Sequence, residues 1–419
     1  MSEAAPRRLD GAAWLARGPL PRLLAALDRD GEEARVIGGA VRNALLGETP
    51  HEFDIATTAL PETVIARAAA SGFKSVPTGI EHGTVTVIVA GTPFEVTTLR
   101  QDVETFGRRA TVRFGRDWRT DAERRDFTIN ALSVSRDGTL HDYVGGLADI
   151  AVRRVRFIGE ARERIREDYL RILRFFRFHA AYGHGAPDPA GLHAAIAERA
   201  GLSRLSRERV RMEWMKLLAA AGVVDAVRVM ADAGFVGLLL GNVPLVDSLS
   251  RLVAIEAQRG IAADPVRRLA ALCVVVTEDA ERLREQLRLS NAEHERLAAM
   301  AQGWWRVGRD LSGRAMRALL FELGPQAFAD RVMLAWARDG ADPEDPDWNA
   351  ALGLPARWAA PRFPVRSADL VARGVPAGPA LGAALAEAQS AWIAADFPDD
   401  PASFERIAAA AASRHRGRG

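Results

Sequence analysis

The sequence has a single cysteine, Cys273, among its 419 residues. One cysteine cannot form an intramolecular disulfide, and it excludes a cysteine-rich zinc site. The chain also lacks any run of about 18 or more apolar residues, so we expect no membrane span. Residues 1–22 mix charge, proline and glycine without the apolar central stretch of a secretory signal. These absences together predict a soluble protein of the cytoplasm.

Lysine is nearly absent as well, since only Lys74 and Lys216 occur and the other basic residues are arginine or histidine. The formal net charge is only +2, so the overall charge favours a polyanionic partner weakly. Arginine suits bidentate contacts with phosphates and bases. A GC-rich coding bias explains most of the global excess, and we therefore interpret only arginines in informative local patterns.

The order of strand-like and helix-like segments predicts an α+β head followed by an all-helical remainder. Two β-branched runs are separated by a hairpin signal, and the stretch before them reads as a helix that starts at Pro61 and ends before Gly72. From about residue 160 onward, strand signals almost vanish. We expect five parts: an N-terminal helix or extension (1–32), a head (33–155), a helical neck (156–240), a helical body (241–354) and a helical tail (355–419) with a disordered basic end (414–419).

Glu52 and Asp54 form the first candidate constellation. Within a strand, residues i and i+2 share a face, so both carboxylates would point one way with Phe53 buried behind them. Adjacent carboxylates repel unless a cation lies between them, and Mg²⁺ prefers oxygen ligands and phosphate partners. Glu95 would face the pair across the sheet, and three carboxylates with two Mg²⁺ ions make a phosphoryl-transfer site. Taken alone, such a pair also occurs on solvated strand edges.

A double glycine supplies the context. A strand-like run enters Gly38 and Gly39, and a helix-like stretch follows with Arg42 in its first turn. Such a turn brings backbone N–H groups and a helix N-terminus to a phosphate. The pattern is neither the dinucleotide fingerprint nor a P-loop, because no lysine follows the glycines. An ordinary tight turn is the alternative, but the carboxylate pair about a dozen residues later favours phosphate binding.

These segments resemble the tRNA nucleotidyltransferase and bacterial poly(A) polymerase family, the class II branch of the polymerase-β-like superfamily. The resemblance covers about residues 33–220. It rests on motifs in a fixed order: GGAVR (38–42), EFDIAT (52–57), GIEHGTV (79–85), FEVTTLR (94–100), RRDFTINAL (124–132), DYVGG (142–146), EDYLR (167–171) and LSRER (205–209), the last continuing to Glu213. The resemblance implies a polymerase-β-like nucleotidyltransferase head followed by an all-helical neck, body and tail.

The resemblance also implies roles for individual residues. Glu52 and Asp54 match the metal-binding pair for two Mg²⁺ ions, and Glu95 matches the third catalytic carboxylate. The positions that match nucleotide contacts are Gly38, Gly39, Arg42, Arg125, Asp126, Asn130, Asp168, Arg171, Arg174 and Arg177.

Asp168 and Arg171 match the pair that reads the base of CTP or ATP. If both lie on one helix at positions i and i+3, they are neighbours on one face. An aspartate accepts from an exocyclic amino group, which cytosine and adenine carry and uracil lacks. Because a helix has 3.6 residues per turn, Arg177 would lie roughly opposite Asp168, where a structural role is equally expected.

Three positions depart from the family pattern. Glu52 stands where aspartate is usual, Asn43 follows Arg42 where aspartate is usual, and Tyr169 stands where proline is common. A longer carboxylate still binds Mg²⁺ but shifts the geometry. These departures leave open a reduced activity or a non-catalytic relative. The retention of Asp54, Glu95, Asp126, Asp168 and Arg171 argues against a non-catalytic relative.

The implied activity is template-independent transfer of CMP and AMP from CTP and ATP to the 3′ end of tRNA, with release of pyrophosphate. The alternatives are a poly(A) polymerase on the same fold, an enzyme that adds only CC or A, and an RNA-binding relative without chemistry. The arginine-rich stretch 102–121, which includes Arg108, resembles the flexible loop needed to switch from C to A addition. The sequence does not set the oligomeric state.

Overall fold

The computed structural model describes residues 7–9, 11–106, 109–309 and 311–416. The chain divides into two compact units, Met1–Leu238 and Leu239–Gly419, which are described separately. In the described residues no helix is long and apolar enough to cross a membrane.

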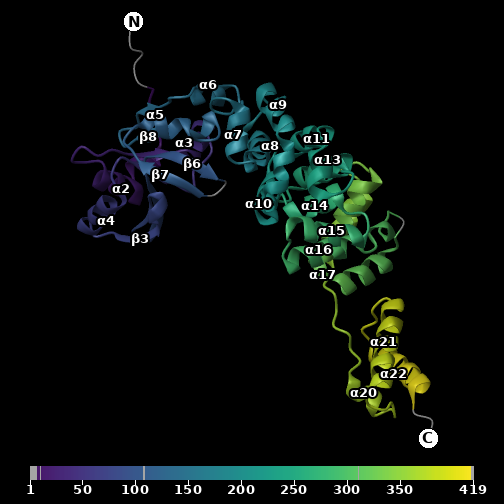
Figure 1. The fold of residues 1–419 in the computed structure, drawn as a ribbon. Helices are drawn as coiled ribbons and strands as arrows, with labels where there is room; N and C mark the ends of the chain where they lie inside the picture. Colours follow the sequence, from purple (N-terminus) through teal and green to yellow (C-terminus); the bar gives the residue numbers. More distant parts are fainter. Residues whose placement is uncertain (1–6, 10, 107–108, 310, 417–419) are drawn as a thin grey trace. The chain divides into compact units, whose positions relative to one another are not determined.

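A seven-stranded sheet forms the framework of the head in the first unit (Figure 1). Its strands are β1 (Ala34–Ile37), β2 (Asp54–Thr57), β3 (Lys74–Gly79), β4 (Thr84–Val89), β5 (Thr92–Thr98), β8 (Ser133–Ser135) and β9 (Leu140–His141). Across the sheet they run in the order β3-β4-β5-β2-β1-β8-β9, and only β2 and β5 pair in parallel. The β4–β5 hairpin confirms the two strands predicted from the β-branched runs.

Short helices surround this sheet: α1 (Ala13–Ala16), α2 (Pro19–Leu27), α3 (Gly39–Leu45), α4 (Pro61–Ala70), α5 (Trp118–Glu123) and α6 (Gly146–Ala151). Helices α2 and α4 pack against each other and against the sheet (Figure 1). Helix α4 begins at Pro61, and Gly72 after its end has a φ of 72°, as the sequence predicts. Leu23 and Leu27 of α2, with Val64 of α4, are fully buried or nearly so and form part of the core beneath β4.

The arginine-rich stretch after β5 forms a second, two-stranded sheet. Strands β6 (Arg100–Phe106) and β7 (Arg109–Phe114) pair antiparallel, and α5 follows. The sequence resembles a flexible loop here, and the described backbone of the segment forms this strand pair. Arg108 lies outside the described residues.

A helical neck completes the first unit: α7 (Ala161–Glu167), α8 (Leu170–Tyr182), α9 (Pro189–Ala197), α10 (Arg207–Ala219), α11 (Val223–Asp232) and α12 (Phe235–Leu240), the last crossing the division between the units. Buried aromatic rings join neck and head, since Phe127 of the head contacts Phe157, Phe175 and Phe178 at centroid distances of 4.9, 6.4 and 5.1 Å. This cluster fixes α8 against the segment 124–132. Short 3₁₀ turns are η1 (Ile80–His82), η2 (Thr128–Asn130), η3 (Arg199–Arg204) and η4 (Trp304–Arg306).

The second unit is helical throughout its described residues: α13 (Val246–Arg259), α14 (Pro265–Cys273), α15 (Thr277–Leu287), α16 (Asn291–Ala301), α17 (Gly313–Asp339), α18 (Pro346–Leu352), α19 (Leu354–Arg357), α20 (Ser367–Val371), α21 (Pro379–Ala394) and α22 (Pro401–His415). A buried ion cluster holds α13, α14 and α17 together, because Arg267 bonds both Glu256 at 2.9 Å and Asp330 at 3.2 Å. The mixed head followed by helices confirms the predicted fold class.

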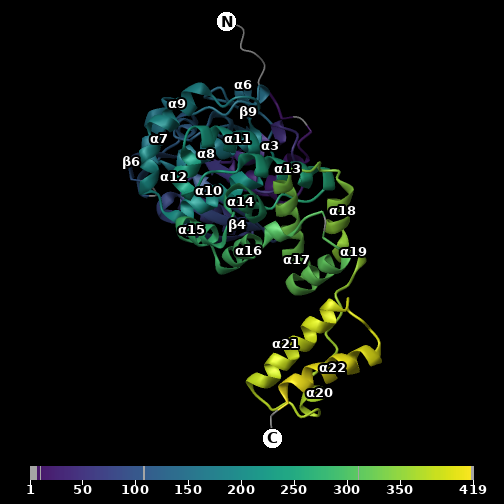
Figure 2. The same cartoon turned by 90° about the vertical axis from the view of Figure 1, so that its right-hand side faces the viewer.

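The last three helices, α20 to α22, share a small core of their own (Figure 2). The basic end was predicted to be disordered, but α22 continues to His415 because Glu387 of α21 pairs with both Arg414 and His415. Residues 417–419 lie outside the described residues.

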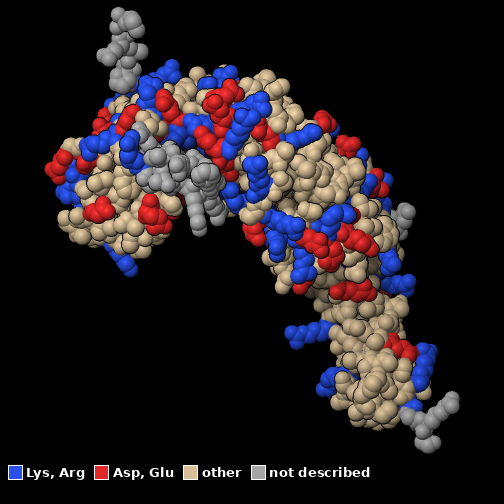
Figure 3. All heavy atoms as spheres, in the orientation of Figure 1, with Lys and Arg blue, Asp and Glu red and all other residues tan. Residues whose placement is uncertain are grey.

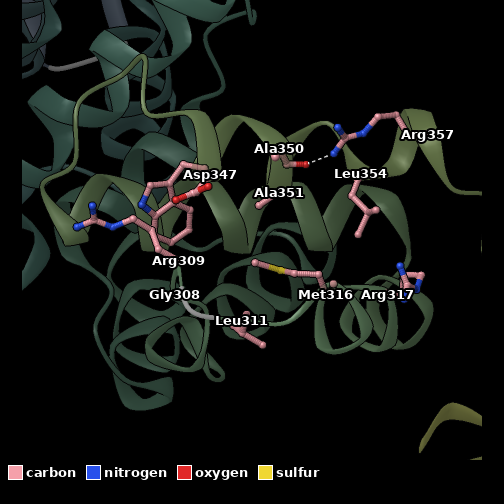
Figure 4. A pocket seen from close by; sticks show the side chains of 12 residues that line it. Gly308, Arg309, Leu311, Met316, Arg317, Asp347, Ala350, Ala351, Leu354 and Arg357 are labelled. Carbon is pink, nitrogen blue, oxygen red and sulfur yellow. Dashed lines mark hydrogen bonds between the residues drawn. The ribbon is translucent and has the colours of Figure 1, made fainter. Parts of the chain in front are cut away.

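A pocket of about 230 Å³ lies beside α17, α18 and α19 (Figure 4). Met316, Ala351 and Leu354 form its apolar surface, and Arg357 donates a hydrogen bond to the carbonyl oxygen of Ala350. Arg317 at its edge already pairs with Asp396 at 2.5 Å. Because its arginines are engaged within the protein, we assign it no function.

Candidate active site

Asp54 and Glu95 occupy directly paired positions on the parallel strands β2 and β5. The other neighbour of Asp54 is Ile37, the last residue of β1. Both carboxylates therefore lie side by side on neighbouring central strands, next to the strand that leads into the glycine turn, and Glu95 pairs with Asp54 across the sheet as the sequence predicts. Glu52 differs from expectation, because β2 begins only at Asp54 and Glu52 lies in the preceding loop.

Phe53 is also not buried behind the carboxylates. Its ring is half-buried and contacts Trp14 of α1 at a centroid distance of 5.1 Å, with the planes tilted by 45°. Phe53 precedes the first paired residue of β2, Asp54, and its phenyl ring packs on α1 instead of the sheet core. This contact sets the direction in which the chain enters β2.

The three carboxylates line one open pocket of about 620 Å³, together with residues of α1, the start of α2, β4 and β5. Burial first, and then the neighbouring charge of Glu95, raise the pKa of Asp54 above its ordinary value, with Glu52 adding to the effect and Arg125 opposing it. The site thus has an excess of negative charge that a cation would relieve. Within the described part of the chain, however, no three His, Cys, Asp or Glu side chains converge as a group able to hold a metal ion.

The glycine turn has the conformation that its sequence requires. Gly38 has a φ of 65°, a region that residues with a Cβ rarely adopt, and α3 starts at Gly39. A Cβ on Gly38 would lie 3.6 Å from Nη1 of Arg125, so this guanidinium stands directly beside the turn. Asp121 holds Arg125 in place by accepting a hydrogen bond of 3.0 Å.

Arg42 is buried in the middle of α3 rather than exposed in a cleft. Its Nη1 donates to Oδ1 of Asn130 at 2.5 Å, and its Nη2 donates to the Tyr182 hydroxyl at 2.7 Å. Asn43 accepts from Nε and Nη2 at 3.1 and 2.8 Å. Burial lowers the pKa of Arg42, although arginine keeps its charge. Asn43, which replaces the usual aspartate, thus orients Arg42 as a neutral acceptor.

Asp126 and Arg174 connect the head to α8. Nε and Nη2 of Arg174 contact Oδ2 of Asp126 at 2.7 and 2.6 Å, and Nδ2 of Asn130 donates to Oδ1 of Asp126 at 3.2 Å. Burial by itself would raise the pKa of Asp126, but Arg174 and Asn130 outweigh burial and lower it. The ion pair therefore stays charged at neutral pH.

Glu213 of α10 extends this network, since it accepts from Nε of Arg177 at 2.5 Å and lies 3.9 Å from Nη1 of Arg174. The guanidinium of Arg177 also lies over the Phe178 ring at 4.2 Å. Arg177 is thus held between α8 and α10, which lie side by side (Figure 1). These contacts give Arg177 a defined structural partner.

The predicted helical pairing of Asp168 and Arg171 is wrong in one respect. Asp168 lies between α7 and α8 in an extended conformation, and its side chain accepts from the backbone N–H of Leu170, the first residue of α8, at 3.1 Å. Its other oxygen accepts from Nη2 of Arg209 at 2.6 Å, while Arg171 donates to Glu167 at 2.5 Å. The two residues are close along the chain, but each has a different partner.

Three residues of this site went unassigned at the sequence level: Tyr182, Arg209 and Glu213. Arg209 and Glu213 fall in the segment 205–213 that matched a family motif, so their position carried a signal. Tyr182 had no such sequence signal, because it is the last residue of α8 and its partner Arg42 is 140 positions away in the chain.

Comparisons with known proteins agree with this arrangement. A family model described as "Poly A polymerase head domain" matches residues 34–156. The "CCA tRNA nucleotidyltransferase 1, mitochondrial" of Danio rerio is 35% identical over 381 residues, covering 86% of this chain and 83% of that protein. The "CCA-adding enzyme" of Limosilactobacillus fermentum is 31% identical over 369 residues, covering 88% and 90%. The crystal structure of the Bacillus stearothermophilus CCA-adding enzyme in complex with CTP matches with a TM-score of 0.75 at 28% identity, covering 94% and 96%.

The fold and the site thus define a nucleotidyltransferase with a poly(A) polymerase type of head. The chain belongs to the class II CCA-adding tRNA nucleotidyltransferase family and is an enzyme of that type. Nucleotidyltransferases of this family generally use divalent metals.

Proposed function

We propose that this site adds the nucleotides of CTP and ATP to the 3′ end of tRNA and builds the full CCA sequence. The observation that supports it best is the strand register. Asp54, the first residue of β2, is paired with Ile37 at the end of β1 on one side and with Glu95 within β5 on the other, so the glycine turn and two carboxylates lie on three neighbouring strands. Such an arrangement suits a nucleoside triphosphate whose phosphates lie against the turn and whose α-phosphate lies at the carboxylates.

The carboxylates fit a divalent cation by chemistry. Glu52, Asp54 and Glu95 offer only oxygen donors. Burial, and then repulsion from Glu95 and Glu52, raise the pKa of Asp54, and a bound cation would relieve that repulsion. Two Mg²⁺ ions, held by Glu52 and Asp54 with Glu95 beside them, would neutralise charge on the reacting oxygens. Glu52 lies two residues before the start of β2, and its side chain is one methylene longer than that of the usual aspartate.

The other residues bind and orient the nucleotide. Gly38, Gly39 and Arg125 would contact the phosphates, and Arg42, Asn130, Asp126, Arg174 and Arg177 would fix the sugar and phosphates from the network between head and neck. Asp168 and Arg171 would read the base, with Arg209 orienting Asp168. The terminal ribose hydroxyl attacks the α-phosphorus, a new P–O bond forms as the bond to pyrophosphate breaks, and the hydroxyl proton leaves to solvent.

The second unit would hold tRNA by shape and phosphate contacts. Basic and acidic side chains are interspersed over the face drawn in Figure 3, in accordance with the formal net charge of +2. A specific shape is therefore a better basis for recognition here than a large positive field. The cytoplasm stays our prediction for the compartment, although the mitochondrial relatives name another one.

Product length tests this function. Purified protein, Mg²⁺ and a tRNA that lacks its CCA end are incubated with CTP, ATP or both, and products are resolved to single nucleotides. Addition of three nucleotides that requires both substrates supports CCA addition. A long ladder with ATP alone supports a poly(A) polymerase, two cytidylates support a CC-adding enzyme, and the absence of any extension contradicts a catalytic role.

A further inference from the structure

The pocket around the carboxylates extends away from the nucleotide site. One part of its lining consists of Trp14 and Arg17 from the N-terminal segment, with His51 and Phe53 from the loop before β2. The residues assigned to the incoming nucleotide, from the glycine turn to the Asp126 network, do not line it. Asp54 and Glu95 therefore have the strand of the glycine turn on one side and the pocket beside Trp14 on the other.

The strand order shows on which side of the carboxylates the glycine turn and the pocket lie. Going across the sheet, β1 with its glycine turn comes first, then Asp54 on β2, then Glu95 on β5, and β4 with Thr86 last. In phosphoryl transfer the attacking and leaving oxygens lie roughly in line on opposite sides of the phosphorus. If pyrophosphate leaves on the side of the glycine turn, the attacking hydroxyl comes from the side of Trp14.

The chemistry of this part of the lining suits a nucleoside. Trp14 is half-buried and is supported by Phe53 at 5.1 Å, so the indole is held in place while part of it faces solvent. Arg17 is exposed, and within the described part of the chain its side chain forms no hydrogen bond or ion pair. A flat aromatic surface with a nearby guanidinium is how proteins bind single-stranded nucleic acid, the ring taking the base and the cation the phosphate.

We propose that Trp14, supported by Phe53, stacks on the base of the 3′-terminal nucleotide of the RNA that is extended, and that Arg17 contacts its backbone phosphate. This inference rests on the proposed function and adds a second substrate site to it. Since stacking tolerates any base, the same surface accepts the discriminator nucleotide first and each added cytidine afterwards.

The experiment uses the full chain and two RNA substrates that lack CCA, one intact and one abasic at its 3′-terminal nucleotide with the ribose hydroxyl retained. For the wild type, we expect removal of the base to lower kcat/KM by on the order of tenfold or more. Trp14→Ala should raise KM for the intact RNA by a similar factor and leave KM for CTP unchanged. For this variant, kcat/KM should differ little between the intact and the abasic RNA. Trp14→Phe should restore most of the affinity for RNA.

Arg17→Ala provides a second variant, with the exposed Arg22→Ala on α2 as its matched control. Arg17→Ala should weaken RNA binding more strongly at low salt than at high salt, and Arg22→Ala should not. An abasic effect that is equal in wild type and Trp14→Ala overturns the stacking proposal, as does a rise in KM for CTP alone. A wild type that extends neither RNA contradicts the proposed function itself, so the two failures are distinguishable.

Discussion

Asp54 and Glu95 face each other across the parallel pairing of β2 and β5, and burial together with this neighbouring charge raises the pKa of Asp54. A carboxyl with a raised pKa binds its proton more tightly in the folded state, so the folded protein loses stability as pH rises through that pKa. The arrangement thus lowers the stability of the protein at neutral pH, which is typical of a functional site.

Asp54→Asn should separate function from stability. Removing the charge should lower kcat by about 10³-fold, because a divalent cation supplies several kcal/mol of charge stabilisation. The melting temperature at pH 7.5 should stay equal or rise, since the repulsion with Glu95 is gone. Primer extension and calorimetry on the same preparation measure both, and retained turnover would contradict the metal assignment.

Arg209 should control base selection although it is far from Asp168 in sequence. Its Nη2 holds one carboxylate oxygen of Asp168 at 2.6 Å. Hydrogen bonds to charged groups are worth about 1.5–3 kcal/mol, so Arg209→Ala should reduce discrimination between CTP and UTP roughly 10- to 100-fold. Lys216→Ala, an exposed change on the same helix, is the charge-matched control. Equal selectivity in both variants would show that Asp168 does not need this partner.

The sequence predicted those elements whose signals are local. The glycine turn, β4, β5 and α4 follow from glycine, proline and β-branched residues at fixed spacings, and the structure has them near the expected bounds. Asp54 and Glu95 were predicted to meet because both lie on strands of alternating pattern. Such signals need only a few neighbouring residues.

What the sequence could not supply depends on contacts between distant segments. Asp168 was expected on a helix, but it lies extended between α7 and α8, where its side chain accepts a hydrogen bond from the N–H of Leu170 at the start of α8. The pairing of Arg42 with Tyr182 joins two helices that no periodic pattern relates. Propensity does not determine which of many arginines meets which carboxylate, because that choice is made by packing in three dimensions.

The ion pair between Asp126 and Arg174 should contribute stability that depends on pH. Arg174 and Asn130 outweigh burial and lower the pKa of Asp126, so this contribution is present above the unfolded pKa of about 3.9 and is lost as pH falls through the folded value. Asp126→Asn should lower the free energy of unfolding by about 2–3 kcal/mol at pH 7. This loss is at the lower end of what breaking a buried ion pair costs, because the Arg174 side chain is 31% exposed.

Thermal unfolding tests this pair. A loss of that size should lower the melting temperature by roughly 5–10 °C at pH 7, and the difference from wild type should shrink toward pH 3. Asp232→Asn at the exposed end of α11 should leave the melting temperature nearly unchanged. A difference that is constant with pH would mean that the loss comes from packing and not from charge.

Tyr182 should act on the nucleotide through Arg42. Its hydroxyl accepts from Nη2 of Arg42 at 2.7 Å, and its ring lies 3.8 Å from the same guanidinium. Tyr182→Phe keeps the ring and removes the hydroxyl, so we expect KM for CTP to rise about three- to tenfold with little change in melting temperature. Tyr143→Phe removes a comparable hydroxyl that accepts from Arg35 at 3.0 Å, away from Arg42, and should leave KM for CTP unchanged. If both variants change KM for CTP equally, the effect comes from a general loss of order in the head and not from Arg42. If only Tyr182→Phe raises KM for CTP, Arg42 contacts the nucleotide in the orientation that Tyr182 sets.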